Sequence, residues 1–534
     1  MTARRLVLGI VGFCVVAALS AQEQGPPMPR QAPQAARAEP ATPLYKTGLG
    51  TFHRPISSTN TETQAFFDQG FQMMYAFAKP EAIGSFREAW KRDPDCAICH
   101  WGEAWAWGSY LNEPMSERDA PSAHAAAQRA LALIDRASPV ERALITAIVT
   151  RYPASFDVAK QVDYDRAYAN VMAQVAAAYP DDPDAGTLYA EALFLLEPRR
   201  GLRDATTPAV QRLHAELERV LAMDVLHPGA CHLYVHATES TVVPAKAEAC
   251  AEFLGKSIPG ASHINHMPSH TWNEVGRWGD SVRANIQAWH SDLKAAIGEG
   301  FAIYPSHNLH MLLYAASMDG QGAIAMQAGK DYAKLTGDTM FQVLTLVRFG
   351  RFDEVAAVTQ RPRSEVNAGV WDFAQGYAKL RGGDVEAAQV YLDRMRQTAM
   401  TAKGGFRFHT AAELLGVLGD ILEGEIVRGR GNLPEAIRVF ERGVALEDTF
   451  QYDEPEAMPF AARHWLGAAL LEAGRAADAE RTYREELVDH PRNGWSLLGL
   501  RQALVAQGKP TSQVDTEFDA SWARADTWIR GSRF

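Results

Sequence analysis

The sequence predicts an all-α solenoid built from repeated antiparallel helix pairs. Three observations support this fold class: apolar residues recur at helical spacing, β-branched residues are few in these segments, and a pattern of small and aromatic residues repeats along the chain. In each repeat a glycine precedes an alanine, and an aromatic residue follows the alanine by four positions. The repeats are Gly70, Ala82 and Phe86; Gly382, Ala387 and Tyr391; Gly431, Ala436 and Phe440; and Gly474, Ala479 and Tyr483.

This pattern is typical of tetratricopeptide repeats. The small residues allow two helices to approach closely, the aromatic residue fills the gap between them, and a proline such as Pro94 or Pro491 follows the second helix. Such repeats stack into a right-handed superhelix whose first helices line a concave groove. We expect an N-terminal array over residues 45–340 and a C-terminal array over residues 341–534.

The composition excludes several classes of protein. Hydrophobic residues make up 47% of the 534 residues and charged residues 22%, so the chain is neither disordered, collagen-like nor a multi-span membrane protein. The net charge of −11 also argues against a nucleic-acid partner, which would favour a basic surface.

The first 21 residues predict a secretory signal peptide. Arg4 and Arg5 form a basic start, residues 6–19 are mostly apolar, and small residues up to Ala21 suit cleavage. The alternative is an uncleaved membrane anchor. Residues 22–44 are rich in Pro, Ala and Gln and predict a disordered spacer. We therefore expect an exported protein, periplasmic or secreted, with no membrane span after cleavage.

Four cysteines follow the predicted signal peptide, namely Cys96, Cys99, Cys231 and Cys250. An even number in an exported protein predicts two disulfides; three pairings are possible, and the local one (Cys96 with Cys99, Cys231 with Cys250) is favoured. Cys96, Cys99 and His100 also match the attachment signature of a c-type haem. A packed helical repeat leaves little room for a haem, so a disulfide or thiol pair at a helix N-terminus is the preferred interpretation, with copper capture by the two sulfurs a minor option.

Three pairs of histidines follow the repeat period in the middle of the chain. The members of the first two pairs are four residues apart and those of the third are three apart, so each pair shares one helix face. The first two pairs are 34 residues apart, which is one repeat length, and the third follows after 40 residues. The six residues are His232, His236, His266, His270, His307 and His310.

This register predicts a transition-metal site in the concave groove. Imidazole suits Zn, Cu, Fe and Ni, and six of them allow either one site or two ions with three histidines each, as in coupled dicopper proteins. Glu239 lies on the same face as His236 and is a candidate ligand or general base. His263 and His290 are off the repeat register and are left out. The alternative is a role without a metal, in which these histidines form hydrogen bonds to backbone carbonyls or to a bound peptide.

Other features receive structural interpretations. Glu103, Glu191 and Glu274 are most simply solvated or repeat-capping residues, and the aromatic residues of 66–77 and 101–107 are hairpin core. The chain has no phosphate-binding glycine loop, nucleophile elbow or zinc-protease motif, which disfavours those hydrolases.

Several motifs carry a resemblance to a family. They are FFDQGFQMMYAF, DPDCAICHWGEA, HPGACHLYVHATE, HINHMPSHTWNEVGRWGDS, YPSHNLHMLL, YDEPEAMP and HPRNGWSLLGLRQAL, and they are spread over residues 50–534. The chain resembles a group of exported bacterial tetratricopeptide-repeat proteins to which no reaction is assigned. The resemblance implies a full-length helical-repeat fold and places the six histidines in the family's His-rich motifs.

Two classes of function remain from the sequence. The first is a metal-dependent enzyme whose groove holds a small-molecule or peptide substrate over the histidines. Copper with oxidative chemistry is favoured over zinc, because there are six histidines and the compartment is oxidising; zinc would support hydrolysis, with Glu239 or Glu274 as base. The second is a scaffold whose groove binds a peptide or protein partner, with a structural metal or none.

Overall fold

The computed structural model describes residues 42–198, 203–224 and 226–534. The predicted signal peptide and almost all of the predicted spacer lie outside the described residues. The part before the histidine-rich middle contains η1 (Ile134–Arg136), η2 (Val158–Lys160), α1 (Thr61–Tyr75), α2 (Lys79–Arg92), α3 (Ala97–Trp107), α4 (Ala120–Ala132), α5 (Pro139–Val149), α6 (Gln161–Ala178), α7 (Pro183–Phe194) and α8 (Pro208–Met223).

The middle of the chain consists of shorter helices followed by long ones. They are α9 (Pro228–Glu239), η3 (Pro244–Ala247), α10 (Glu248–Ser257), α11 (Ser262–His266), α12 (Pro268–Glu274), α13 (Trp278–Ala295), α14 (Pro305–Met318), α15 (Gly322–Thr336), α16 (Met340–Arg348) and α17 (Phe352–Ala357).

The remaining part is again made of helix pairs, with one small hairpin. The elements are α18 (Glu365–Arg381), α19 (Val385–Thr401), β1 (Gly405–Phe406), β2 (His409–Thr410), α20 (Ala411–Gly429), α21 (Leu433–Glu447), α22 (Arg463–Glu472), α23 (Ala476–Asp489), α24 (Gly494–Ala506) and α25 (Ser512–Trp522). The strands β1 and β2 pair antiparallel, with Phe406 opposite His409.

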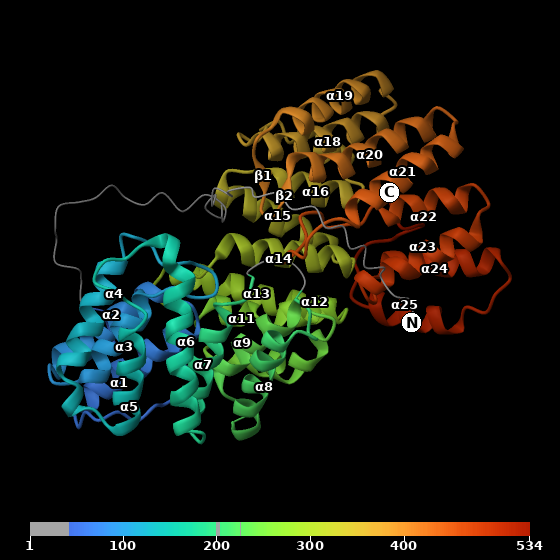
Figure 1. Ribbon diagram of the computed structural model, residues 1–534. Helices are drawn as coiled ribbons and strands as arrows, with labels where there is room; N and C mark the ends of the chain where they lie inside the picture. Colours follow the sequence, from blue (N-terminus) through green and yellow to red (C-terminus); the bar gives the residue numbers. More distant parts are fainter. Residues whose placement is uncertain (1–41, 199–202, 225) are drawn as a thin grey trace, which may run out of the picture.

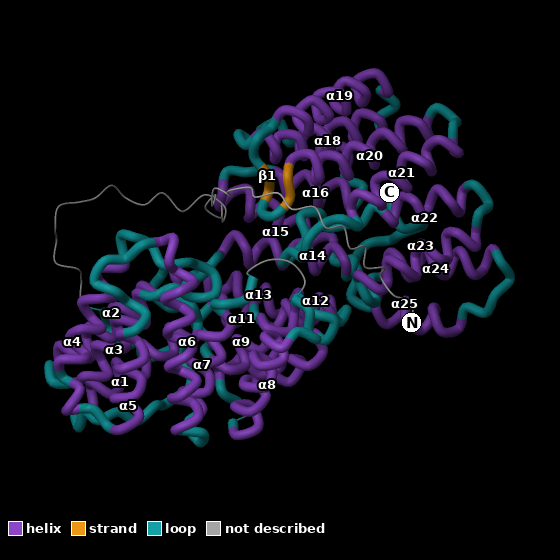
Figure 2. Tube along the Cα trace, in the orientation of Figure 1, coloured by secondary structure: helices purple, strands orange, loops and turns teal. Residues whose placement is uncertain are grey.

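The prediction of an all-α tetratricopeptide-type solenoid is confirmed. Figures 1 and 2 show successive antiparallel helices stacked side by side along most of the chain. Each helix packs against the next one, and first helices of neighbouring pairs also touch, as α1 does with α3, α18 with α20, and α22 with α24. None of the described helices is both long and apolar enough to cross a bilayer.

The glycine and aromatic residues of the repeat explain how the pairs stack. The ring of Phe86 on α2 lies against Gly70 on α1 and Gly102 on α3, and a Cβ at either glycine would come within 3.0 Å of the ring. Tyr483 on α23 fills the same position between Gly467 and Gly499. Each aromatic residue therefore joins the first helices of two successive pairs, which fixes their spacing.

The buried apolar side chains form two clusters. The buried members of one lie within residues 66–303 and those of the other within residues 278–514. The two ranges overlap, because Phe301 and Ile303 belong to the first cluster while Trp278 and Val282 belong to the second, so the predicted division of the chain at residue 340 stays a prediction. Helix α14 lies where the two halves of the ribbon meet, beside α11 to α13 (Figure 1). This junction is where the histidine-rich helices lie.

Candidate metal centre

Four helices at the junction carry buried or half-buried histidines that face one another. They are α9 with His232 and His236, α11 with His263 and His266, α12 with His270, and α14 with His307. The spacing of His266 and His270 predicts one continuous helix, but α11 ends at His266 and α12 begins at Pro268. Proline lacks a backbone N–H and is favoured in the first turn of a helix, so Pro268 begins a new helix here.

The six imidazoles divide into two sets of three. Triad A is His232, His236 and His263, and triad B is His266, His270 and His307; within each triad one ligand atom per residue lies within 4.8 Å of the others. The triads are adjacent, because the ring centroids of His236 and His270 are 5.2 Å apart and those of His263 and His266 are 5.6 Å apart. The ring centroids within each triad are similarly spaced, so the two triads form one continuous layer of imidazoles.

Two residues differ from the prediction. His263, left out as off register, completes triad A, whereas His310 does not reach either triad. The His310 ring lies against Phe341, with centroids 4.0 Å apart, and its Nε2–H donates to the Glu456 carbonyl at 3.2 Å. His290 is exposed on α13. The sequence does contain a pattern that includes His263, because positions 263, 266 and 270 have the i, i+3, i+7 spacing of one helix face.

Four of the six imidazoles have their Nδ1 atoms committed to acceptors. The Nδ1 of His232 lies 2.6 Å from the Tyr75 carbonyl oxygen, and the Nδ1 of His266 lies 2.8 Å from Oδ1 of Asn285. Both His236 and His270 direct Nδ1 to the carboxylate of Glu239. Metal-binding histidines use such outer acceptors to fix the tautomer and the ring orientation.

This arrangement leaves the Nε2 atoms facing one another. The Nε2 atoms of His266 and His270 are 2.7 Å apart, and those of His232 and His263 are 3.1 Å apart. Two imidazole nitrogens bound to one ion at about 2.0–2.1 Å lie about 2.8–3.4 Å apart for angles between square and tetrahedral. The Nε2 of His236 is buried without a hydrogen-bond partner among the described residues. The Nε2–Nε2 distance in triad A lies within this range and that in triad B is slightly shorter, and a donor set of imidazole nitrogens suits transition-metal ions.

The environment keeps most of these imidazoles neutral, which is the form that binds a metal. Burial and the nearby histidines hold the pKa values of His232, His263 and His266 well below the usual value, and they lower the pKa of His236 to about 3. Burial also opposes the charged form of His270, but the carboxylate of Glu239 overcomes it and raises the pKa of His270 to about 10. The charged form of His270 is therefore favoured, and a metal ion that binds its Nε2 atom has to displace a proton.

Glu239 and a distant loop surround the outer side of the triads. The sequence analysis treats Glu239 as a ligand or general base, but its oxygens contact Nδ1 atoms rather than the Nε2 atoms. From the loop between α21 and α22, Tyr452 donates its hydroxyl to Glu239 at 3.3 Å, and a Glu454 oxygen lies 3.0 Å from Nδ1 of His270. His236, Glu239, His270 and Glu454 form a further group of metal-ligating type on this outer side.

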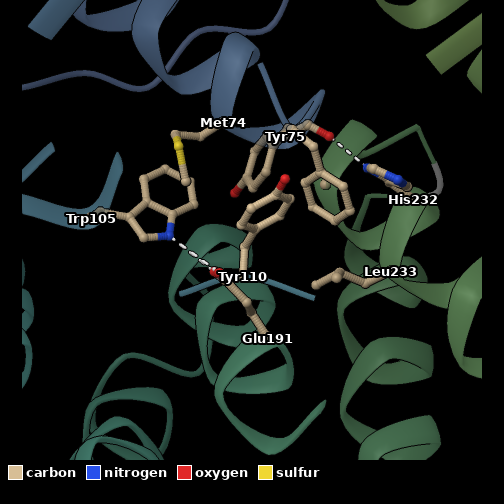
Figure 3. A pocket seen from close by; sticks show the side chains of 9 residues that line it. Met74, Tyr75, Trp105, Tyr110, Glu191, His232 and Leu233 are labelled. Atoms are coloured by element: carbon tan, nitrogen blue, oxygen red, sulfur yellow. Dashed lines mark hydrogen bonds between the residues drawn. The ribbon is translucent and has the colours of Figure 1, made fainter. Parts of the chain in front are cut away.

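An aromatic pocket adjoins triad A. Figure 3 shows Tyr75 and Tyr110 between Trp105 on one side and His232 on the other, with the Trp105 indole N–H donating to Glu191. Phe77 also lines this pocket, and its ring centroid is 4.3 Å from that of His232. The aromatic rings therefore close triad A from the side of α1 and α3.

Two residues that contact His263 have strained backbones. Phe77 and Tyr304 have φ values of 59° and 56°, in the left-handed region that non-glycine residues rarely adopt. Their ring centroids are 5.4 and 5.2 Å from that of His263, and the Tyr304 hydroxyl lies 2.5 Å from that of Tyr110. Such strain costs on the order of 1–3 kcal/mol per residue and tends to cluster at functional sites.

Three glutamates that the sequence analysis treats as solvated or capping are placed differently. Glu103 is buried, accepts from Trp90 and pairs with Arg87, which is a structural ion pair. Glu191 is 8% exposed, and burial raises its pKa to about 7. Glu274 is half-buried; burial and the charge of Glu239 raise its pKa to about 8.

The cysteines are paired locally. The structure joins Cys96 to Cys99 at the start of α3, and Cys231 on α9 to Cys250 on α10. Thioether attachment of a haem would need the sulfurs of both Cys96 and Cys99, which are bonded to each other here. The His100 ring stacks on Trp90, with centroids 5.1 Å apart. The second disulfide ties the helix that carries His232 and His236 to its neighbour.

Comparison with known proteins gives matches of structure but none of sequence. No family model and no curated protein matches the chain. The human IFIT1 dimer with m7Gppp-AAAA is similar at 10% identity and a TM-score of 0.33, covering 80% of this chain and 90% of that one. The P58(IPK) TPR domain (11%, TM-score 0.23, 84% and 99%) and yeast Tom70 (12%, TM-score 0.27, 87% and 92%) are also similar.

Proposed function

We propose that this chain binds two transition-metal ions, one on each histidine triad, and that it is a metal-dependent oxidative enzyme in which copper is favoured. The observation that carries this proposal is the pairing in triad B. The Nδ1 atoms of His266 and His270 both point at acceptors while their Nε2 atoms lie 2.7 Å apart. Two facing lone pairs at that distance need a proton or a metal ion between them, and the other four imidazoles of the two triads are further nitrogen donors.

The donor set favours copper over the other metals. Each triad offers three imidazole nitrogens, whereas Mg, Ca and Mn prefer oxygen ligands. Among divalent ions a nitrogen site binds copper most strongly. The two disulfides fit the oxidising compartment that the sequence analysis expects, where copper chemistry with oxygen is favourable.

The chain's own residues would contribute binding, orientation and exclusion of water. Copper, when bound, supplies one-electron exchange with dioxygen or peroxide. Burial favours the neutral form of most of the imidazoles, and the carbonyl of Tyr75, the amide of Asn285 and the carboxylate of Glu239 orient the rings that donate to them. We place a small-molecule or peptide substrate in the groove beside the triads, at the junction of the two halves.

Metal analysis of untagged protein tests this proposal. The protein purified without a His tag and reconstituted with copper should hold two ions per chain, and a His236→Ala, His270→Ala double variant should hold fewer than one. Consumption of oxygen by the loaded wild type, absent from the double variant, would support oxidative chemistry. Retention of zinc in preference to copper would favour hydrolysis instead. A wild type that binds no metal would refute the site and leave a scaffold.

A further inference from the structure

Glu239 occupies a special position between the two triads. It is the last residue of α9, and its side chain is almost fully buried. One carboxylate oxygen lies 2.7 Å from Nδ1 of His236 in triad A, and the other contacts Nδ1 of His270 in triad B. A single carboxylate thus holds one imidazole from each triad.

The other outer partners of the triads each hold one imidazole. Of the imidazoles in the triads, the Tyr75 carbonyl accepts from His232 alone and Asn285 from His266 alone, while Glu454 lies at ion-pair distance from His270. Within the described part of the chain, Glu239 is the outer hydrogen-bond acceptor that the two triads share. The hydroxyl of Tyr452, 3.3 Å away, contacts the same oxygen that faces His270.

We infer that Glu239 is a positioning residue that couples the two metal sites, so that an ion on one triad raises the affinity of the other triad for its ion. This inference rests on the proposed function, because it concerns the same two sites. It assigns to Glu239 neither a ligand role nor that of a general base, since its oxygens face the Nδ1 side of both imidazoles.

The coupling has two physical sources. An ion on His236 makes its Nδ1–H a stronger donor, which fixes the carboxylate in the orientation that His270 also needs. The second ion then binds to a site that is already ordered. In addition, the negative charge of Glu239, which contacts one imidazole of each triad, would offset the cost of holding two cations in neighbouring sites. Couplings of this kind change affinity by about 5- to 150-fold.

A metal titration of the whole chain tests the coupling. Chelator-stripped protein is titrated with Zn²⁺, a redox-silent probe, by calorimetry and by competition with a chromophoric chelator. Wild type should bind two ions with positive cooperativity. Glu239→Gln keeps the size of the side chain but removes its charge and one acceptor oxygen. It should weaken both sites by about 10- to 100-fold and abolish cooperativity, while two ions still bind at saturation.

Two matched variants distinguish coupling from a general loss of structure. Asn285→Ala touches one imidazole of triad B and should weaken that site only, with triad A unchanged. Glu454→Gln removes a charge that lies near His236 and His270 but leaves Glu239 in place, so it should weaken binding while cooperativity remains. Circular dichroism should show the same helix content in all three variants. Independent sites in wild type, an effect of Glu239→Gln on one site only, or the loss of an ion from this variant at saturation would overturn the coupling. A wild type that binds no ion would overturn the metal proposal as well.

Discussion

Replacing His263 with alanine should remove one metal ion from the protein, whereas replacing His310 with alanine should leave both. The two residues are a matched pair, since both are buried histidines next to the same layer of rings. His263 has its Nε2 atom 3.1 Å from that of His232, so it shares the inner side of triad A. The ring of His310 packs on Phe341 and its Nε2 atom faces a backbone carbonyl.

The expected loss of metal affinity in His263→Ala can be estimated from the number of ligands. A four-ligand structural zinc site is worth about 10–16 kcal/mol, or about 2.5–4 kcal/mol per ligand. Losing one ligand of triad A should therefore weaken that site by about 10²–10³-fold. At a metal concentration 100 times the wild-type dissociation constant, triad A of the variant would be about 10–50% filled, so the total falls from two ions to about 1.1–1.5 per chain.

Equilibrium dialysis followed by elemental analysis measures this difference. Thermal unfolding of the metal-free variants serves as the control, because a folded His263→Ala protein that lacks one ion locates the defect in the site. For His310→Ala we expect a lower unfolding midpoint in both the metal-free and the loaded protein, since the contact with Phe341 is lost, but full metal content. If His310→Ala loses an ion while His263→Ala keeps two, the division into triads A and B is wrong.

Three further predictions concern stability. Burial raises the pKa of Glu191 from 4.5 to about 7, so the folded chain binds this proton more tightly than the unfolded chain does. The proton therefore contributes to the free energy of unfolding below pH 4.5, and this contribution is lost as the pH rises through 7. Glu191→Gln should therefore gain about 3 kcal/mol relative to wild type between pH 4 and pH 8, measured by urea unfolding; a gain that does not depend on pH would contradict this. Gly102→Ala should lower the melting temperature, because its methyl group would overlap the aromatic ring of α2 at a cost of about 1–3 kcal/mol. Gly429 has open space around it, so Gly429→Ala should be neutral or stabilising. Equal effects of the two substitutions would refute the packing argument. Removing the Cys231–Cys250 disulfide by a double alanine substitution opens a loop of 19 residues and should cost about 3 kcal/mol. The variant should then unfold at a lower midpoint than wild type under non-reducing conditions, and an unchanged midpoint would count against this.

The repeat pattern predicted the fold because it reports local packing. A glycine opposite an aromatic ring is needed wherever two first helices approach, and that requirement recurs at a fixed interval along the chain. The observed contact of Phe86 with Gly70 is the one that the spacing implies, and the structure adds a contact with Gly102. The short hairpin β1–β2 and the two clusters of buried side chains have no comparable signal, because they depend on which helices meet at the junction.

The candidate site was predicted in part. The repeat register identified five of the six residues of the triads, but it placed His310 in the site and left His263 out. The register assumes one continuous helix per repeat, whereas Pro268 divides that helix into α11 and α12 and changes which faces meet. Glu454 and Tyr452 are more than 180 residues away from His270 in the sequence and were noted only as part of the YDEPEAMP motif. Their contact with the site depends on how the second half of the solenoid returns to the first.

The sequence by itself determined the helical repeat, the local pairing expected of the cysteines and the presence of imidazoles at spacings that share a helix face. These follow from interactions between residues close in the chain, where periodicity is informative. Only the tertiary structure decided that the imidazoles form two triads and that Glu239 lies between them. It also decided that their inner nitrogens face one another in a buried layer. Those properties depend on distances between helices from different repeats, which spacing along one chain does not specify.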